Sequence, residues 1–356
     1  MTSPDPSRAA PVRPRVAVIG TGGTFAMHAR HAFDWVEYGE SGVVHPIEDM
    51  LGQIESLGLD IDIVPVTFRA VGSTAIVPQD WLELAQLITA TAAADPGLAG
   101  FVVTHGTATL EETAWFLDLS VHVPQAIVLT GAQRPQNTAG SDALPNLRAA
   151  LAVAACAQAA SMGTVVVMDS MIFAARDVTK AASFELNAFE AKPFGPLGRV
   201  NPDGVVSFRR RPFGAEPAQR FNLQAVKTLP RVDLVTSYAG ADGVVIDALV
   251  TAGTKGIVSV GLPPGRPANG ERNAFQTAVS QGVVVVQASR AARGVVPPQA
   301  FLHRDGVLAG GDLAPQKLRI LLMLMLASTP ALSPGAMQSL ILESGGELLP
   351  GASAIA

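Results

Sequence analysis

Short runs of β-branched residues alternate along this chain with alanine- and leucine-rich stretches that have helical spacing. The strand runs lack polar alternation, which indicates strands buried on both faces and hence mostly parallel pairing. The pattern therefore predicts an α/β fold with crossover helices. In the first half of the chain we expect strands at 15–20, 60–66, 100–104, 126–130 and 163–168, and helices at 78–94 and 145–160.

The regular alternation stops between about residues 192 and 230 and then resumes at 232–236, 242–251, 256–260, 273–281 and 283–287. A chain of 356 residues also exceeds the size at which one hydrophobic core usually keeps growing. We therefore expect a larger N-terminal domain, with a mostly parallel sheet flanked by helices, and a smaller C-terminal α/β domain. The expected divisions are a disordered extension (1–14), a catalytic domain (15–205), a linker (206–230) and the C-terminal domain (231–356).

The composition narrows the classes of function. A net charge of −5 provides no basic face, so we expect no nucleic-acid partner. The only cysteine, Cys156, lies in an alanine-rich stretch and is expected to pack in the interior. The most apolar segment, 318–326, is too short to span a membrane and predicts a buried helix. The first fourteen residues lack the apolar run of a secretory signal, which favours the cytoplasm.

Ligands of open parallel sheets bind beyond the carboxyl ends of the strands, and polar clusters follow several of the expected strands. The first is the turn Gly20-Thr21-Gly22-Gly23-Thr24. A dinucleotide-binding turn would require glycine where Phe25 stands, and a tight turn without chemistry is a further alternative. The hydroxyl of Thr24 directly after two glycines instead indicates an accessible nucleophile, with backbone N–H groups beside it as an oxyanion hole.

A second cluster, Thr104 to Thr113, leads from a strand into a helix. Thr109 and Glu112 fit a capping box, so we expect them to initiate that helix. Thr107 precedes the free N–H groups of the helix, where an anion is favoured. His105 is a possible general base, but without a carboxylate partner it is expected to be a hydrogen-bonded structural histidine.

A third cluster, Arg176 to Lys180, follows the strand at 163–168. Lys180 gains a chemical role only if it projects towards Thr107, where an amine beside a hydroxyl could exchange a proton. The spacing of His28, His31 and Asp34 could place metal ligands on one helical face, but their glycine-rich and polar surroundings favour a loop. We therefore expect neither a metal nor a cofactor.

Together these clusters resemble the bacterial L-asparaginase/glutaminase family of two-domain amidohydrolases. The resemblance rests on five segments in family order: IGTGGTFA (19–26), THGTATLEETAWFLDL (104–119), TGAQRP (130–135), RDVTK (176–180) and GDLAPQKLRILL (311–322). It implies hydrolysis of a small carboxamide to a carboxylate and ammonia through a threonine acyl-enzyme. It also implies a homotetramer built from two intimate dimers, in which a neighbouring C-terminal domain completes each site.

The resemblance assigns roles to individual residues. Thr24 becomes the nucleophile, and Thr107 and Lys180 become the second half of the catalytic machinery. Tyr38 is the candidate for the tyrosine that the family carries on a mobile lid. The substrate-binding set implied by the same motifs comprises Gly23, Ser73, Thr74, Gly106, Ala108 and Ala132. Ser73 and Thr74 align with residues that hold the substrate's α-carboxylate, and the backbone at Ala132 lines the amide pocket.

One position departs from the family pattern: Ala108 stands where the motif has an aspartate that binds the substrate's α-ammonium. An amidase for carboxylate-bearing amides without an α-amino group is one outcome. An asparaginase whose ammonium partner comes from Glu37 or from a neighbouring subunit is another. A catalytically silent sensor of a small acid or amide is the alternative from a different class. The proline-bearing turn before Asn269, whose family counterpart reaches a partner's site, is a second sign of an altered substrate.

Overall fold

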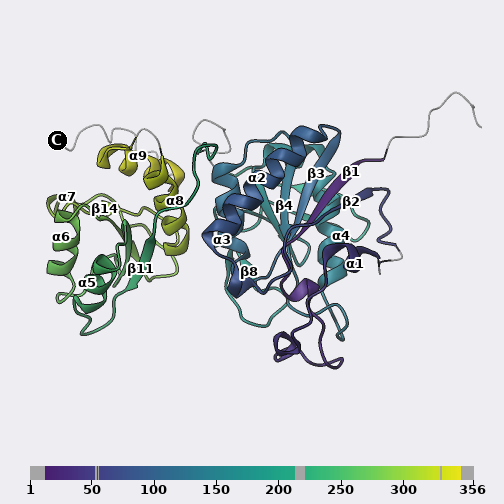
Figure 1. Cartoon of the computed structure of the whole chain (residues 1–356), viewed down its shortest axis with the longest axis horizontal. Helices are drawn as coiled ribbons and strands as arrows, with labels where there is room; N and C mark the ends of the chain where they lie inside the picture. Colours follow the sequence, from purple (N-terminus) through teal and green to yellow (C-terminus); the bar gives the residue numbers. More distant parts are fainter. Residues whose placement is uncertain (1–12, 53, 55, 213–220, 329–330, 346–356) are drawn as a thin grey trace, which may run out of the picture.

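The computed structural model describes residues 13–52, 54, 56–212, 221–328 and 331–345, which form two α/β domains (Figure 1). The N-terminal sheet has the strand order β10-β9-β6-β5-β4-β3-β1-β2. Strands β1 to β5 pair in parallel, and β6, β9 and β10 extend the sheet with antiparallel pairing. The strands are β1 (Arg15–Gly20), β2 (Asp62–Val66), β3 (Leu98–Thr104), β4 (Ala126–Thr130), β5 (Thr164–Met168), β6 (Met171–Ala174), β9 (Gly198–Val200) and β10 (Val206–Phe208).

Helices cover both faces of this sheet, which explains why its central strands β1, β3, β4 and β5 are apolar at nearly every position. Ala17 and Ile19 of β1 pack in the core beneath α2 (Pro78–Ala94) and α3 (Leu110–Ser120). Val16 and Val18 point to the opposite core, beneath α1 (Ile47–Gly52) and α4 (Ala143–Ala154). Figure 1 shows these helix pairs on the two sides of the sheet. The expected mostly parallel sheet flanked by helices is confirmed.

The C-terminal domain has a smaller, wholly parallel sheet in the order β11-β12-β13-β14. Helices α5 and α6 pack on one face, around Ile246 and Phe275, and α8 lies between the other face and the N-terminal domain. The elements are β11 (Val232–Thr236), α5 (Val244–Thr251), β12 (Gly256–Gly261), α6 (Arg272–Ser280), β13 (Val284–Ser289), α7 (Ala300–Arg304), β14 (Leu308–Ala309), α8 (Pro315–Ala327) and α9 (Pro334–Gly345). The apolar segment 318–326 is the buried centre of α8, as its length predicted.

Polar contacts through α8 join the two domains. Lys317 is almost completely buried and donates a hydrogen bond to the carbonyl oxygen of Ala175. Burial lowers the pKa of Lys317 to about 8, although the nearby Glu111 carboxylate favours the charged form. Trp115 of α3 donates to the Lys317 carbonyl oxygen at 3.1 Å. The hydrophobic core that contains α3 therefore continues into α8, and these hydrogen bonds fix the alignment of the two helices.

The structure differs from the expected element boundaries in two places. The helix expected at 145–160 is α4, which begins at Ala143 and ends at Ala154 because the backbone turns to an extended conformation at Cys156. Cys156 is half-buried and packs against the core beneath α4, in agreement with a packing role. The linker expected at 206–230 contains β10, which hydrogen-bonds to β9, so the N-terminal sheet extends to Phe208. Residues 1–12 of the expected extension lie outside the described residues.

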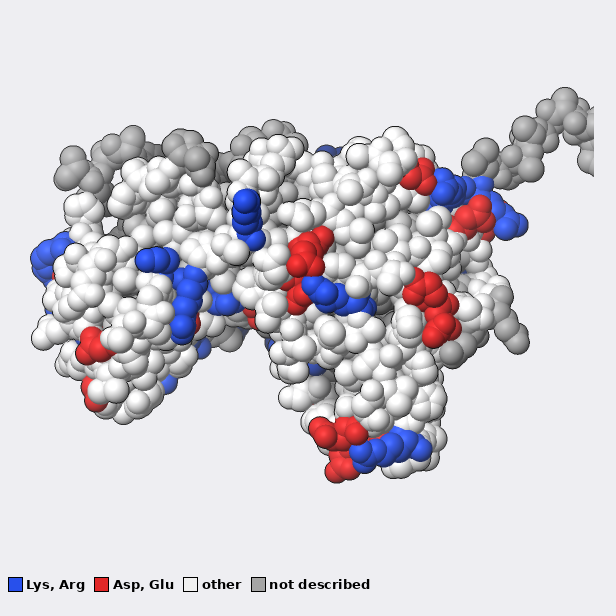
Figure 2. Space-filling model, in the orientation of Figure 1, with Lys and Arg blue, Asp and Glu red and all other residues white. Residues whose placement is uncertain are grey.

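No helix in the described ranges is both long enough and apolar enough to cross a membrane. On the face shown in Figure 2, the Lys and Arg side chains of the described residues occur in small separate groups, several of them beside Asp or Glu. That face therefore carries no continuous basic patch of the kind that binds a nucleic-acid backbone.

Candidate active site

The glycine turn after β1 brings two loops into direct contact. Gly22 and Gly23 have φ values of 105° and 71°, which L side chains rarely adopt. A Cβ on Gly23 would lie 2.2 Å from the Cα of Gly106, so the backbone at this point has no room for a side chain. This contact places Thr24, at the start of a short 3₁₀ helix, beside the loop that carries Thr107.

The hydroxyl of Thr24 pairs with a tyrosine from the following loop. The side-chain oxygens of Thr24 and Tyr38 lie 2.8 Å apart, within hydrogen-bonding distance. Thr24 is 7% exposed, so most of its surface is covered by the protein. The structure thus brings together the two residues to which the resemblance assigned the roles of nucleophile and lid tyrosine.

The loop that carries Tyr38 is fastened to the segment after β4. Asn137 accepts a hydrogen bond from the Ala29 N–H and donates one to the Ala29 carbonyl oxygen, at 3.0 and 2.7 Å. The guanidinium of Arg134 stacks over the Trp35 ring at 4.0 Å. Asp34 accepts hydrogen bonds from the backbone N–H groups of Arg30 and Glu37, so its carboxylate stabilises the shape of the loop. In the described residues, no group of three or more His, Cys, Asp or Glu is suitably placed to bind a metal ion.

A second hydrogen-bonded pair lies after β3. Lys180, in the short strand β7 (Thr179–Lys180), donates from Nζ to Oγ1 of Thr107 at 2.7 Å. Lys180 therefore projects towards Thr107, which is the condition for its chemical role. Partial burial lowers the pKa of Lys180, while the nearby Asp142 carboxylate raises it. The lowered pKa increases the fraction of neutral amine available to accept a proton.

Asp142 is a residue whose role the sequence did not reveal. Its carboxylate accepts hydrogen bonds at 3.0 Å from the backbone N–H groups of Gln133 and Arg134, and so shapes the loop between β4 and α4. On the same helix, Asn146 donates to the carbonyl oxygen of Gly131 at 3.0 Å. An Asp directly before an alanine-rich helix is a recognisable N-cap signal, but the Asp142 side chain makes no cap hydrogen bond, and only the fold places its charge near Lys180.

The loop that carries Ser73 packs against the same backbone. A Cβ on Gly106 would lie 2.3 Å from the Cβ of Ser73, and Ser73 is half-buried while Thr74 is exposed. The hydroxyl of Thr109 donates to the Ser73 carbonyl oxygen at 2.9 Å. The capping box expected for Thr109 was therefore wrong: its side chain makes no cap hydrogen bond, because it fastens this neighbouring loop. Glu112 instead lies 3.7 Å from Arg319 of α8.

The remaining expected site residues lie in different surroundings. Ala132 is fully buried directly after β4, whereas Ala108 is exposed in the single chain. Glu37, a suggested partner for a substrate ammonium, lies 3.8 Å from Arg30 with its side chain largely exposed. Asn269 is exposed on the C-terminal domain.

His105 is a buried structural residue. Its Nδ1 lies 2.9 Å from the carbonyl oxygen of Gly106, and its Nε2 lies 2.9 Å from the hydroxyl of Thr113. Because Thr113 accepts from the indole of Trp81 at 2.9 Å, its own proton points to Nε2. Nδ1 therefore carries the ring proton and donates to Gly106, which supports the backbone beside Thr107. Burial lowers the pKa of His105 to about 4.

This pKa predicts a pH-dependent stability. The unfolded chain protonates His105 near its ordinary pKa of 6.5, whereas the folded chain resists protonation down to about pH 4. The contribution of His105 to the free energy of unfolding is therefore fully present above pH 6.5. It decreases by about 3 kcal/mol as the pH falls towards 4. Urea unfolding of the wild type and His105→Gln across this range measures the effect. Parallel pH profiles of the two proteins would contradict it.

These features define a class: a two-domain α/β protein with two hydroxyl-centred pairs, Thr24–Tyr38 and Thr107–Lys180, beyond the carboxyl ends of parallel strands. Residues 15–213 match the family model described as asparaginase, N-terminal. Residues 231–339 match the model for the glutaminase/asparaginase C-terminal domain. The chain belongs to the asparaginase/glutaminase family and is an asparaginase-like amidohydrolase.

Individual relatives extend over nearly the whole chain. L-asparaginase 2 of Escherichia coli (strain K12) is 33% identical over 327 residues, which cover 91% of this chain and 92% of that protein. L-asparaginase 2 of Bacillus subtilis (strain 168) is 34% identical over 317 residues, covering 89% and 83%. A crystal structure described as a probable cytoplasmic L-asparaginase from Campylobacter jejuni superimposes with a TM-score of 0.86, at 32% identity, over 93% of this chain and 99% of that one.

Proposed function

We propose that this amidohydrolase cleaves a small, carboxylate-bearing carboxamide through an acyl-enzyme on Thr24. The 2.8 Å contact between the Thr24 and Tyr38 oxygens carries the proposal. As Oγ1 of Thr24 attacks the amide carbonyl, its proton passes to the Tyr38 oxygen while Tyr38 releases its own phenolic proton to the amide nitrogen. The C–N bond then breaks, the proton leaves with ammonia, and the acyl group remains esterified to Thr24.

Hydrolysis of the ester requires activation of a water molecule, and the Thr107–Lys180 pair suits this task. The neutral amine of Lys180 can take a proton through Thr107 as water attacks, and it returns that proton when Thr24 leaves as a hydroxyl. Backbone N–H groups of the glycine turn are the available donors for the developing oxyanion. Two such pairs favour catalysis over a silent sensor, because binding alone requires no amine beside a hydroxyl.

The substrate proposed is an amide that lacks an α-ammonium group, such as the monoamide of a dicarboxylic acid. Ala108 supports this assignment, since a methyl group cannot pair with an ammonium. Asparagine remains the competing substrate if a carboxylate from Glu37 or from a neighbouring subunit supplies the partner. Ammonia release from succinamic acid, asparagine, glutamine and simple amides distinguishes the two. If the enzyme hydrolyses asparagine faster than succinamic acid, the proposed preference for an amide without an α-ammonium group is rejected.

The substitution Ala108→Asp is expected to raise kcat/KM for asparagine by roughly 10- to 150-fold, because a hydrogen-bonded charge pair contributes about 1.5–3 kcal/mol. The exposed position accommodates a carboxylate without a buried charge. Ala108→Asn, which has nearly the same size but no charge, serves as the matched control. Equal gains in both variants, or no gain in either, would show that charge at this position does not select the substrate.

We also propose that the enzyme is a cytoplasmic homotetramer. Support for self-association comes from exposed apolar side chains on the C-terminal domain, including Tyr238, Val244 and Val245 at 58%, 68% and 51% exposure. The Campylobacter structure supports the location through its description, whereas a relative from Haemophilus influenzae is described as periplasmic. Light scattering tests the assembly, and cell fractionation tests the location.

A further inference from the structure

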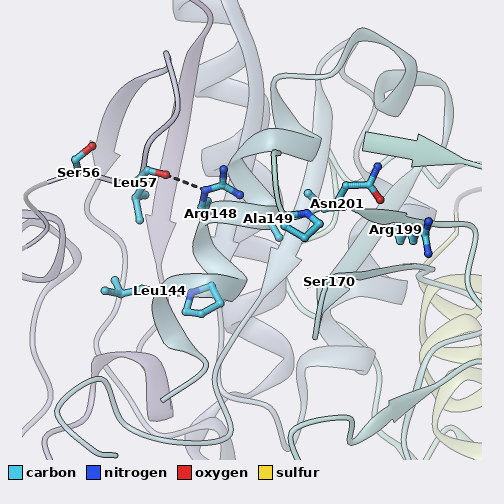
Figure 3. A pocket seen from close by; sticks show the side chains of 11 residues that line it. Ser56, Leu57, Leu144, Arg148, Ala149, Ser170, Arg199 and Asn201 are labelled. Carbon is cyan, nitrogen blue, oxygen red and sulfur yellow. Dashed lines mark hydrogen bonds between the residues drawn. The ribbon is translucent and has the colours of Figure 1, made fainter. Parts of the chain in front are cut away.

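A large open pocket lies on the outer side of α4, away from the catalytic threonines. Its volume is about 840 Å³, within the range of small-molecule sites. Figure 3 shows side chains reaching it from α4, from the segment before β2 and from the strands at the sheet's antiparallel edge. The residues used below are Leu57, Leu144, Arg148, Ser170, Arg199 and Asn201.

Two arginines provide the charge of this pocket. Arg148 donates from Nε to the Leu57 carbonyl oxygen at 2.9 Å, which orients its guanidinium and leaves the terminal nitrogens without a hydrogen bond to a described residue. Arg199 extends from β9 and is exposed. Within the described ranges, neither guanidinium forms an ion pair with a carboxylate. The nearby Asp203 carboxylate accepts a hydrogen bond from the Val205 N–H.

The rest of the pocket combines apolar walls with a few polar groups. Leu57 and Leu144 contribute aliphatic surface, and the lining is more apolar than polar overall. Ser170 has a φ of 62° in the tight turn between β5 and β6, an uncommon conformation for a residue other than glycine. Its carbonyl oxygen accepts from the Val200 N–H at 2.8 Å, which fixes the turn beside Asn201. Serine and asparagine side chains add neutral hydrogen-bonding groups.

We propose that this pocket is a second ligand site, which binds an organic dicarboxylate with an aliphatic chain. A guanidinium presents parallel N–H donors that match a carboxylate, and two of them from different elements suit a ligand with two carboxylates. Methylene groups between the carboxylates would cover the apolar wall. The site is separate from the catalytic cluster, since Asn146 on another face of α4 bonds to Gly131 and Asp142. The proposal stands independently of the amidase assignment.

Isothermal titration of the full-length protein with succinate, adipate and suberate tests the site. At least one dicarboxylate is expected to bind, and the tightest is then titrated against variants. Arg148→Gln and Arg199→Gln are each expected to weaken binding by roughly tenfold or more, the loss typical of a hydrogen bond to a charged group. Arg209→Gln is the matched control: it removes one exposed arginine beyond β10, outside the pocket lining, and is expected to change binding less than twofold.

A lysine variant and a monocarboxylate ligand complete the test. Arg148→Lys retains the positive charge but lacks the parallel N–H donors of a guanidinium. This variant is expected to bind the dicarboxylate less tightly than the wild type does, and thermal unfolding is expected to show that it is folded. Octanoate, with one carboxylate, is expected to bind at least about tenfold more weakly than suberate. The proposal is overturned if no dicarboxylate binds, or if binding survives both glutamine substitutions unchanged, as expected for a ligand in the active site alone. Equal affinities for octanoate and suberate would overturn the two-carboxylate class.

Discussion

Replacing Thr24 with alanine is expected to lower kcat/KM for amide hydrolysis by about 10⁴-fold or more. The reason is that the substitution removes the oxygen that forms the acyl-enzyme, and loss of a nucleophile typically removes most of the catalysis by an acyl-transfer enzyme. Thr24→Ser retains a hydroxyl and is expected to keep measurable activity. The measurement is ammonia release at limiting substrate, with hydroxylamine trapping of the acyl group in the wild type.

A neighbouring threonine provides the control. Thr21 lies in the same turn, but it is buried and its hydroxyl donates to the Thr104 carbonyl oxygen at 3.0 Å. Thr21→Ala is expected to destabilise the protein by about 1 kcal/mol and to retain the acyl-enzyme reaction. Retention of full activity in Thr24→Ala would exclude Thr24 as the nucleophile. Inactivity of both variants with intact folding would mean that the turn's shape, rather than its hydroxyl, is essential.

Replacing Lys180 with methionine is expected to lower kcat by about 10²- to 10⁴-fold, the range for a positioned general acid or base. Methionine preserves much of the side-chain volume but cannot donate to Thr107 or accept a proton. Because partial burial lowers the pKa of Lys180, more of the amine is neutral at a given pH. The wild-type rate is therefore expected to rise as the pH increases towards this lowered pKa, and the variant should lose that rise.

Lys192 is the matched control for this substitution. It is an exposed lysine just after β8 (Phe189–Glu190), and its Nζ lies 2.6 Å from a Glu190 carboxylate oxygen. Lys192→Met is expected to keep the wild-type kcat and pH profile. An unchanged pH profile in Lys180→Met would assign the titration to another group and remove Lys180 from the proton path.

Much of the fold follows from local patterns in the chain. The apolar strand runs indicated burial on both faces, and the structure explains this by cores on each side of β1, around Ile19 and Val18. The apolar segment 318–326 indicated a buried helix because its length and composition allow few alternatives. The error at α4 arose because alanines continue beyond its end, so composition provided no stop signal before Cys156.

For the site, the sequence by itself determined which groups are available: a hydroxyl after a glycine turn, a second hydroxyl after another strand, and a lysine whose role depended on reaching that second hydroxyl. Only the tertiary structure decided their geometry, since the Thr107 and Lys180 contact joins the loop after β3 to strand β7 through side chains 73 positions apart. It also decided that Thr109 fastens a loop rather than a helix end. The physical reason is that the chemical identity of a side chain and the conformational freedom of glycine are set by the local sequence. Hydrogen-bonded pairs and lowered pKa values depend instead on packing between distant segments.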